Sequence, residues 1–524
     1  MRPLILALLI AAAAAAQGVW ERRADYPISA TEVSAAAIGD RIYAVCGLAA
    51  TGSTSDLFIY HPALDEWTRG APAPIPGGAD HCNVAAANGR LYLAGAIRIG
   101  GGFVDGNTYE YNPASDQWTT VGRMTIPRGA SGIASDGRRI YVAGGLAPNS
   151  SVPSFEVFDT VTRQWSVLPS MPTPRDHLTA QFVNGRFYAI AGRNSRDLAI
   201  VEEFDPVTVT WRTRASAPTA RGGLASAAVN GKIYVMGGEG NSGTPDATFR
   251  QNEEYDPAAD RWRALPDMPT PRHGLFGAAI GTVIYTPSGG PIAGATYSNR
   301  NEAFIVPPAE APALNGPPLN AASYDPEAAE GMLMTVFGRN LAPGTQSAKP
   351  AMQMLGVRAT LNGAPLQLLF VTPGQLAFRL PNGAASGDFR VQHAGVESAA
   401  VPLRIAGPAR PGIFTLSQDG KGPGAILPAS ARRGAVVEIY CTGLGATLPP
   451  AEGLERTRLD PQVEIGGRDA EVLFSGLAPG LLGVYQVNAR VPVDAAAGGA
   501  AEVRLRAGGA VSNTVTMGIS VEPI

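Results

Sequence analysis

Four arginines recur at one position of a repeated unit in the first part of the chain. They are separated by 47, 46 and 51 residues and are Arg128, Arg175, Arg221 and Arg272. Each lies 13 residues before the tyrosine of an apolar run such as IYVAGG, where the first two runs have Ala30 and Ala79. A planar guanidinium pairs with a carboxylate through two parallel hydrogen bonds. The arginines are therefore candidate ligand-binding residues for a carboxylate, with bonding to strand-end carbonyls or a neighbouring acid as the structural alternative.

Three of the five histidines stand close to the same position: His81, His177 and His273. Three imidazoles would suffice for a metal site. However, His81 and His177 follow the arginine position by two residues and His273 by one, and alternation along a strand then predicts that they point to different sides. We expect no metal here and keep the three histidines as candidate ligand-binding residues.

Other catalytic patterns are weak or missing. The pairs Glu202–Glu203 and Glu253–Glu254 suggest a two-carboxylate glycosidase, but they fall on predicted third strands of the repeat, where outer structural positions are the simpler interpretation. The chain has no phosphate-binding glycine loop, no Gly-x-Ser-x-Gly elbow and no Cys/His metal spacing. Catalytic residues stay unknown, and no cofactor is expected.

The tryptophans reveal the element that positions these side chains. All six form one series with spacings of 47, 51, 47, 46 and 51 residues: Trp20, Trp67, Trp118, Trp165, Trp211 and Trp262. An aromatic residue precedes each of the last five by seven residues. This period is typical of a four-stranded propeller blade, and because a blade cannot bury both faces alone, the repeats are expected to stack around a ring.

Within 18–307 the repeats resemble the kelch family. The resemblance rests on apolar runs that end in a glycine pair, as at Gly144–Gly145 and Gly237–Gly238, followed by a loop, a Tyr or Phe and then Trp. One glycine of the pair is replaced at Cys46, Ala96 and Ala191. The resemblance implies a kelch β-propeller.

Counting the repeats predicts six blades and the way the ring closes. The sixth apolar run, around Tyr285, is followed by the strand-like segment NEAFIV at 301–306 but by no tryptophan, whereas Trp20 precedes the first run. We expect the N-terminal segment to supply the outer strand of the last blade, which closes a propeller over 17–307.

Composition agrees with an all-β protein. The 524 residues include 63 Gly and 44 Pro, and only 16% are charged, which favours short strands and tight turns over helices. The net charge of −3 supplies no cationic surface for nucleic acid. Neither nucleic-acid binding nor membrane insertion is expected.

The remainder of the chain has a different pattern. A Pro-rich linker at 308–318 leads to a tryptophan-free region with an internal duplication, in which TVFGRNLAP (335–343) parallels EIYCTGLGA (438–446). Two immunoglobulin-like β-sandwich modules, 319–408 and 409–524, are predicted. The phrases NAASYDP, VYQVNARVP and SNTVT resemble the uncharacterised C-terminal domain of secreted acidobacterial (Solibacter-type) proteins, over about 315–524.

The N-terminal segment MRPLILALLIAAAAAAQG has one Arg, an apolar stretch and small residues at Ala14 and Ala16. It is interpreted as a signal peptide, 1–16, cut near Ala16, so that a secreted or periplasmic location is expected. In an oxidising compartment Cys46 and Cys82, on neighbouring repeats, are a candidate disulfide, with two buried thiols as the alternative.

Length variation in the repeat is concentrated in the loop after the glycine pair, which in an antiparallel blade lies on the same face as the arginines. Loops on a rigid scaffold are common binding sites. The sequence therefore favours a secreted protein that binds a carbohydrate or protein ligand with this face. A sugar-modifying enzyme of the sialic-acid mutarotase type and a structural surface-assembly component are the alternatives.

Overall fold

The computed structural model describes residues 17–98, 103–148, 150–240, 247–347, 349–450 and 453–521, so the predicted signal peptide lies outside the described residues. The chain divides into two compact units, Met1–Pro307 and Pro308–Ile524. The described residues are all-β, without helices. Among them no helical segment has the length and hydrophobicity that a membrane span requires.

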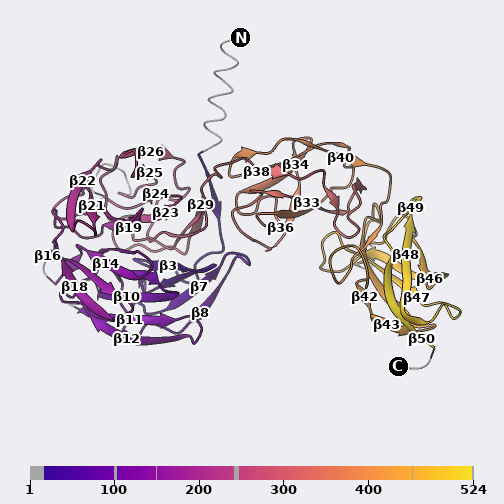
Figure 1. The fold of residues 1–524 in the computed structure, drawn as a ribbon, viewed down its shortest axis with the longest axis horizontal. Coiled ribbons are helices and arrows are strands. Elements are labelled where there is room, and N and C mark those ends of the chain that lie inside the picture. Colours follow the sequence, from indigo (N-terminus) through magenta and orange to yellow (C-terminus); the bar gives the residue numbers. More distant parts are fainter. Residues whose placement is uncertain are drawn as a thin grey trace, which may run out of the picture. The chain divides into compact units, whose positions relative to one another are not determined.

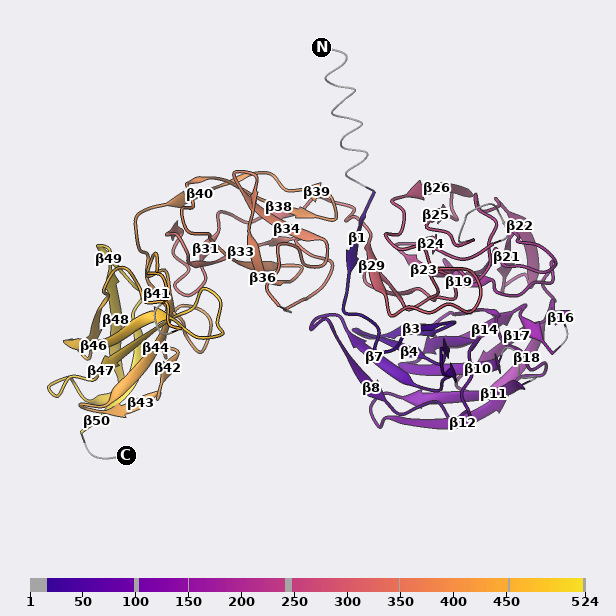
Figure 2. The same cartoon turned by 180° about the vertical axis from the view of Figure 1, so that it is seen from behind.

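The first unit is a ring of six four-stranded antiparallel sheets (Figures 1 and 2). The first three sheets are β3 (Ser34–Ile38), β4 (Arg41–Val45), β7 (Leu57–His61), β8 (Glu66–Gly70); β9 (Val84–Ala87), β10 (Arg90–Arg98), β11 (Phe103–Asn112), β12 (Gln117–Arg123); and β13 (Gly132–Ser135), β14 (Arg139–Ala143), β17 (Phe155–Asp159), β18 (Gln164–Leu168). The next three are β19 (Thr179–Val183), β20 (Arg186–Ile190), β21 (Val201–Asp205), β22 (Thr210–Arg214); β23 (Ala225–Val229), β24 (Lys232–Met236), β25 (Asn252–Asp256), β26 (Arg261–Leu265); and β27 (Ala278–Ile280), β28 (Val283–Pro287), β29 (Asn301–Ile305) with β1 (Val19–Arg22).

The first strand of each sheet lies at the centre of the ring. Each of these inner strands contacts the inner strand of the next sheet, and β27 contacts β3, so the ring is closed. The inner strands are rich in alanine, as in SAAAI of β3 and ASAAV of β23. Small side chains are required there because six strands converge on one axis. The sequence-based prediction of an all-β, six-bladed propeller is confirmed.

An aromatic pair joins the third and fourth strands of each blade. Tyr60 lies opposite Trp67 with ring centroids 4.9 Å apart, and four further blades repeat this pair at 4.9–5.3 Å. In four of these five blades the indole N–H also donates to a backbone carbonyl of the preceding part of the ring, as Trp118 does to Ala71 O at 2.8 Å. The tryptophan therefore packs its own blade and fastens it to a neighbour.

Strand β1 occupies the outer edge of the last blade. It pairs antiparallel with β29, with Val19 opposite Ile305 and Trp20 opposite Phe304. The Trp20 indole lies 5.2 Å from the Phe304 ring and donates to Pro266 O at 2.8 Å. Trp20 thus makes the contacts that the other tryptophans make in their blades, and segments from both ends of the unit share one sheet.

The first half of the second unit forms a five-stranded sheet and a six-stranded sheet. Their strands are β30 (Ala313–Leu314), β31 (Leu319–Asn320), β33 (Leu333–Arg339), β36 (Gln367–Val371), β37 (Gln375–Arg379), and β32 (Glu327–Ala328), β34 (Val357–Leu361), β35 (Ala364–Pro365), β38 (Gly387–His393), β39 (Val396–Glu397), β40 (Val401–Ile405). The second half forms one ten-stranded sheet from β41 (Gly412–Ile413), β42 (Ile426–Leu427), β43 (Ser430–Arg432), β44 (Val436–Thr442), β45 (Gln462–Ile465), β46 (Arg468–Leu477), β47 (Tyr485–Arg490), β48 (Gly498–Ala507), β49 (Ala510–Val511) and β50 (Val515–Ser520).

The two halves of this unit repeat one strand order. The order β33-β37-β36 corresponds to β44-β47-β46, and the parallel pair β32–β40 corresponds to β43–β50. The long strand β46 takes the place of both β35 and β36, which is why two sheets in the first half become one in the second. An immunoglobulin-like assignment of these modules stays a prediction.

The cysteines follow the alternative to the candidate disulfide. Cys46 and Cys82 are both free, buried thiols within one apolar cluster that also contains Leu57 and Leu93. Burial, together with the neighbouring Cys46 thiol, raises the pKa of Cys82 well above its usual range. The pair therefore behaves as two small apolar core residues.

Substituting Trp20 tests the closure of the ring. We expect Trp20→Ala to lower the free energy of unfolding by about 2–4 kcal/mol, because the indole loses both its packing on Phe304 and its hydrogen bond. Val207→Ala, at a valine that is 82% exposed, should change it by less than about 0.5 kcal/mol. Denaturant unfolding of both variants measures this, and equal stabilities would show that β1 contributes nothing to closure.

Candidate functional site

The four candidate arginines are buried structural residues. Each guanidinium is 0% exposed and forms an ion pair with a glutamate on the third strand of its own blade: Arg128 with Glu156, Arg175 with Glu202, Arg221 with Glu253 and Arg272 with Glu302. Each also donates to the carbonyl 14 residues later, on the second strand. Burial lowers the pKa of all four guanidiniums, against the opposing effect of the glutamates.

The prediction that these arginines bind a ligand is therefore wrong for this structure, and the structural alternative applies. A side chain whose charge is already paired and sealed from solvent has nothing to offer a ligand at the surface. The arginine holds the start of its blade to the second and third strands. The two adjacent glutamates have different partners. Glu202 faces Arg175, whereas Glu203 pairs with Arg212 at 2.6 Å on the outer side of the blade.

A belt of backbone hydrogen bonds runs around the axis two residues after each arginine position. The N–H of one blade donates to the carbonyl of the preceding blade, at N···O distances of 2.6–3.2 Å. The five links join His81 to Ala130, Ala130 to His177, His177 to Gly223, Gly223 to Gly274 and Gly274 to Glu32. The belt places equivalent residues from all six blades around one point.

Two polar residues of this belt adopt a backbone conformation that suits glycine better. Glu32 and His177 have φ of 55° and 50°, as does Ala130 at 51°, and two of the remaining three blades have Gly223 and Gly274 in the same region. A side chain in this region costs about 1–2 kcal/mol relative to glycine. Such an outlier suggests that the Glu32 and His177 side chains have a role that offsets the strain.

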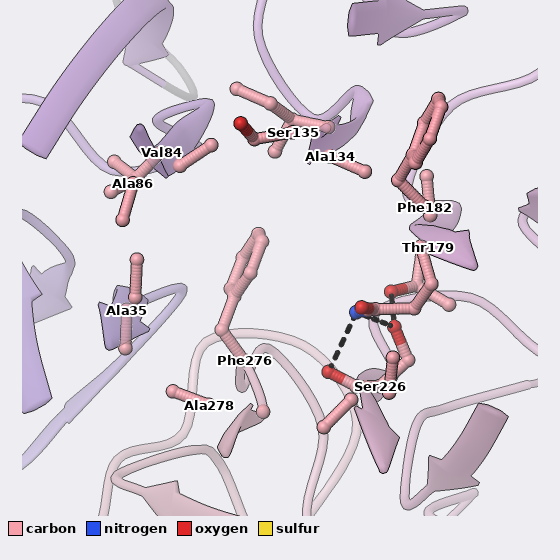
Figure 3. A pocket seen from close by; sticks show the side chains of 18 of the residues that line it. Ala35, Val84, Ala86, Ala134, Ser135, Thr179, Phe182, Ser226, Phe276 and Ala278 are labelled. Atoms are coloured by element: carbon pink, nitrogen blue, oxygen red, sulfur yellow. Dashed lines mark hydrogen bonds between the residues drawn. The ribbon is translucent and has the colours of Figure 1, made fainter. Parts of the chain in front are cut away.

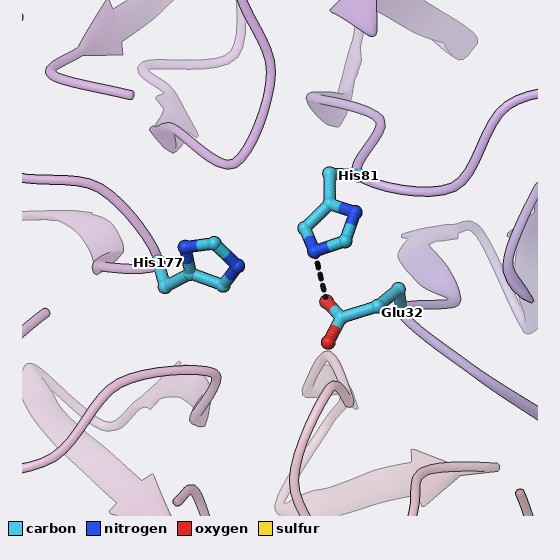
Figure 4. Close-up of side chains that lie close together, drawn as sticks. All are labelled: Glu32, His81 and His177. Carbon is cyan, nitrogen blue, oxygen red and sulfur yellow. Dashed lines mark ion pairs between the residues drawn. The ribbon is translucent and has the colours of Figure 1, made fainter. Parts of the chain in front are cut away.

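His81, His177 and Glu32 meet at the centre of the belt (Figure 4). The imidazole centroids of His81 and His177 lie 4.8 Å apart, and His81 Nε2 is 3.3 Å from Glu32 Oε2. In His81 and His177 the Nδ1 atom forms a hydrogen bond with the carboxylate of the preceding residue, at 2.6 Å for Asp80 and 2.5 Å for Asp176. This bond orients the ring and directs Nε2 toward the axis.

Loops of the preceding blades hold these two aspartates. Ser53 Oγ, in β6 (Gly52–Ser53), donates to Asp80 Oδ2 at 2.6 Å. In the same way Ser151, in β16 (Ser150–Ser151), donates to Asp176 Oδ2. The loops that follow the glycine pairs therefore reach the axial cluster and fix the side chains that orient its histidines.

His273 belongs to the same cluster but takes a different place. Its Nε2 bonds Ile292 O at 2.8 Å, and its Nδ1 lies 3.5 Å from Glu239 and 3.9 Å from Glu32. Glu239 in turn accepts from Arg193 at 2.6 Å. Spacing correctly separated His273 from His81 and His177, but it did not reveal Glu32, which stands two residues after Ala30 as His81 does after Ala79.

We use the name axial cluster for Glu32, Asp80, His81, Asp176, His177, Arg193, Glu239 and His273. It contains four carboxylates and one guanidinium, so it favours a cation or a hydrogen-bond donor over an anion. Burial acts to raise the pKa of Glu239, but His273 and Arg193 outweigh it and hold that pKa below its usual value. Burial lowers the pKa of His177, whereas Glu32 and Asp80 raise the pKa of His81 despite its burial.

A channel lined largely by small side chains lies behind the axial cluster. This cavity of about 240 Å³ is lined by alanines of the inner strands, and the Phe276 ring points into it (Figure 3). Polar groups also line it: Ser135 lies across the space from Thr179, and Gln181 Nε2 donates to Ser226 Oγ at 2.9 Å. Ser131, Leu178 and Phe276 line both this channel and a cavity of about 20 Å³ beside Glu32, His81 and His177.

Comparison with known families finds kelch repeats. The KLHDC2/KLHL20/DRC7 Kelch-repeats domain matches residues 120–290, and the Kelch motif matches residues 30–74. The kelch resemblance seen in the sequence is thereby confirmed. The resemblance of about 315–524 to an acidobacterial C-terminal domain stays a prediction.

Several known proteins are similar to this chain. Kelch-like protein terF of Aspergillus terreus is 31% identical over 308 residues, which cover 54% of this chain and 65% of the relative. N-acetylneuraminate epimerase of Pasteurella multocida is 34% identical over 129 residues, or 23% of this chain and 33% of the epimerase. The chain thus spans less than two thirds of the length of these relatives. A solved structure titled "Structure of YjhT" aligns with a TM-score of 0.45 and 17% identity, over 54% of this chain and 94% of that one.

Removing one buried arginine tests its structural role. We expect Arg175→Ala to cost about 3–5 kcal/mol of unfolding free energy, because Glu202 is left buried without its partner. The double variant Arg175→Met/Glu202→Leu should recover only part of the loss, because it removes the unpaired carboxylate but leaves the carbonyls of Ala189 and Ala191 without their donor. Arg69→Ala, which breaks an exposed pair with Asp56, is the control and should cost less than about 1 kcal/mol. A loss as small as in the control would contradict the role assigned to Arg175.

Proposed function

We propose that this kelch β-propeller protein is a secreted binding protein that recognises a carbohydrate or protein ligand with the face around the axial cluster. The axial cluster itself carries the proposal. It gathers hydrogen-bonding side chains of five blades at one end of the central channel. A concave site with few convergent polar groups on a rigid scaffold is the usual form of a ligand site.

The charge of the axial cluster indicates the chemistry of the ligand. Four carboxylates against one guanidinium match the hydroxyl groups of a neutral sugar or a basic group of a protein, rather than a carboxylate. Arg193 lies at the accessible side, since its side chain is 33% exposed, and the buried Glu239 accepts from it directly behind. These two residues are the proposed first contacts.

A glycan panel with the mature chain tests this proposal. We expect neutral or amino-bearing glycans to bind, and Arg193→Ala or Glu239→Gln to weaken binding at least about 10-fold through lost hydrogen bonds. The matched control is Arg138→Ala, which breaks the 2.6 Å pair with Asp159 in a loop on the opposite face of the propeller. Equal binding by the Arg193 and Arg138 variants, or preference for sialylated glycans, would count against the proposed face and chemistry.

One observation favours an enzyme as the second candidate. His81 Nε2 and Glu32 Oε2, 3.3 Å apart beside a cavity, could act as an acid/base pair, which is what exchange at a sugar carbon requires. The similarity to an N-acetylneuraminate epimerase supports this class, although the excess of carboxylates disfavours an acidic sugar.

Nuclear magnetic resonance of sugar anomer exchange separates the two candidates. A binding protein leaves the exchange rate of N-acetylneuraminate and of neutral sugars at the uncatalysed value. If the wild-type chain accelerates exchange and Glu32→Gln removes the acceleration, the enzyme replaces the binding protein as the better proposal.

Secretion is a separate part of the proposal and rests on the apolar segment before Gln17. Expression of the full chain in a bacterial host should yield an exported protein that begins at Gln17, because the peptidase cleaves after the small residue Ala16. N-terminal sequencing of the exported fraction measures this. A chain that retains Met1 in the cytoplasm would remove secretion from the proposal.

A further inference from the structure

We propose that His81, His177 and Glu32 bind one divalent transition-metal ion, with Zn²⁺ as the best fit. The inference goes beyond the proposed ligand binding and does not depend on it. One ligand atom from each residue lies within 4.8 Å of the other two. Two imidazole nitrogens and one carboxylate oxygen form a donor set that Zn²⁺ accepts readily, whereas Mg²⁺ and Ca²⁺ prefer oxygen.

The distances suit a shared ion after a small closure. Ligands 2.0–2.1 Å from a tetrahedral Zn²⁺ are about 3.4 Å from one another. His81 Nε2 and Glu32 Oε2 are already 3.3 Å apart. Only His177, across the belt, has to approach the other two ligands.

An unpartnered nitrogen supports the site independently. His177 Nε2 is buried and accepts or donates no hydrogen bond among the described residues, while its ring is 7% exposed. A buried polar atom without a partner is rare and calls for an explanation, such as a bound ion. In Figure 4 this ring lies across from His81 and Glu32, on the other side of the space that an ion would occupy.

The surroundings also match a metal site. Asp80 and Asp176 accept from Nδ1 of His81 and His177, an arrangement that commonly orients metal-binding histidines and makes Nε2 more basic. The adjacent cavity of about 20 Å³ has room for one ion or water. Ala130, Gly223 and Gly274 occupy the other three belt positions and leave that space open. A Cβ at Gly274 would lie 2.5 Å from Glu32 Oε1, so this glycine permits the Glu32 position.

This site replaces the expectation that the histidines bind no metal. A site of three histidines was not expected, because His273 differs in register from His81 and His177. The structure substitutes Glu32, which shares the register of His81 and His177, for His273. The ion would have three protein ligands and an open position, which a water or a ligand group can occupy.

Titration of the mature chain with ZnCl₂ tests the inference. The chain carries no histidine tag and is first dialysed against a chelator, and calorimetry should then show one equivalent bound. His81→Ala/His177→Ala should weaken binding at least about 100-fold, and Asp176→Asn about 10-fold because His177 loses its orientation. His61→Ala is the control and should bind as the wild type does, because His61 lies on β7, outside the axial cluster, and bonds Thr68.

Glu32→Gln serves as the variant least able to disturb the fold, since it preserves shape, and it should weaken Zn²⁺ binding about 10-fold. X-ray absorption of the loaded chain should show two imidazole ligands. The inference is overturned if the wild type binds no Zn²⁺, or binds it no more tightly than the double-histidine and Glu32→Gln variants. A chain that binds Zn²⁺ but no glycan keeps the metal site and loses the carbohydrate proposal.

Discussion

The backbone hydrogen-bond belt around the axis is the constraint on which the site depends. Each of its five links joins two sheets, and the link from Glu32 to Gly274 joins the first blade to the last. Such a link forms only if the ring is closed, and β1 completes the last blade by pairing with β29. The belt then gives six residues, far apart in the sequence, equivalent positions around one point, where the side chains of Glu32, His81 and His177 meet.

The charged side chains of the propeller form two groups, the buried arginine–glutamate pairs and the axial cluster. The arginines that begin the blades are sealed against glutamates of the third strands, where burial requires a charged group to be paired. The axial cluster instead keeps an excess of carboxylates and an unpartnered imidazole nitrogen near the loops. The first group stabilises each blade, and the second carries the proposed chemistry, because its side chains converge on one point beside a cavity.

Much of the fold could be predicted from the sequence because the repeat is local. The spacing of Trp67, Trp118 and the later tryptophans follows from the length of a four-stranded blade. Trp20, which precedes the first repeat, and the segment 301–306, which no tryptophan follows, together predict how the ring closes. The site was less predictable. The sequence places Arg128 and its equivalents on the same face as the variable loops. Whether the guanidinium points to a ligand or to Val142 O is decided by side-chain packing. The choice between a disulfide and two buried thiols at Cys46 and Cys82 was open for the same reason, since neighbouring repeats do not specify how the two side chains pack in a shared core.

By itself the sequence determined the all-β class, the period of the blades and their number, since these depend on hydrophobic patterning that each repeat carries within its own 46–51 residues. Only the tertiary structure decided which polar residues share a site. Glu32, His81 and His177 come from the first, second and fourth blades, and no local pattern links them. They meet because a closed ring brings equivalent positions to its axis, and the distance between them there is set by the packing of all six blades rather than by any segment of the chain.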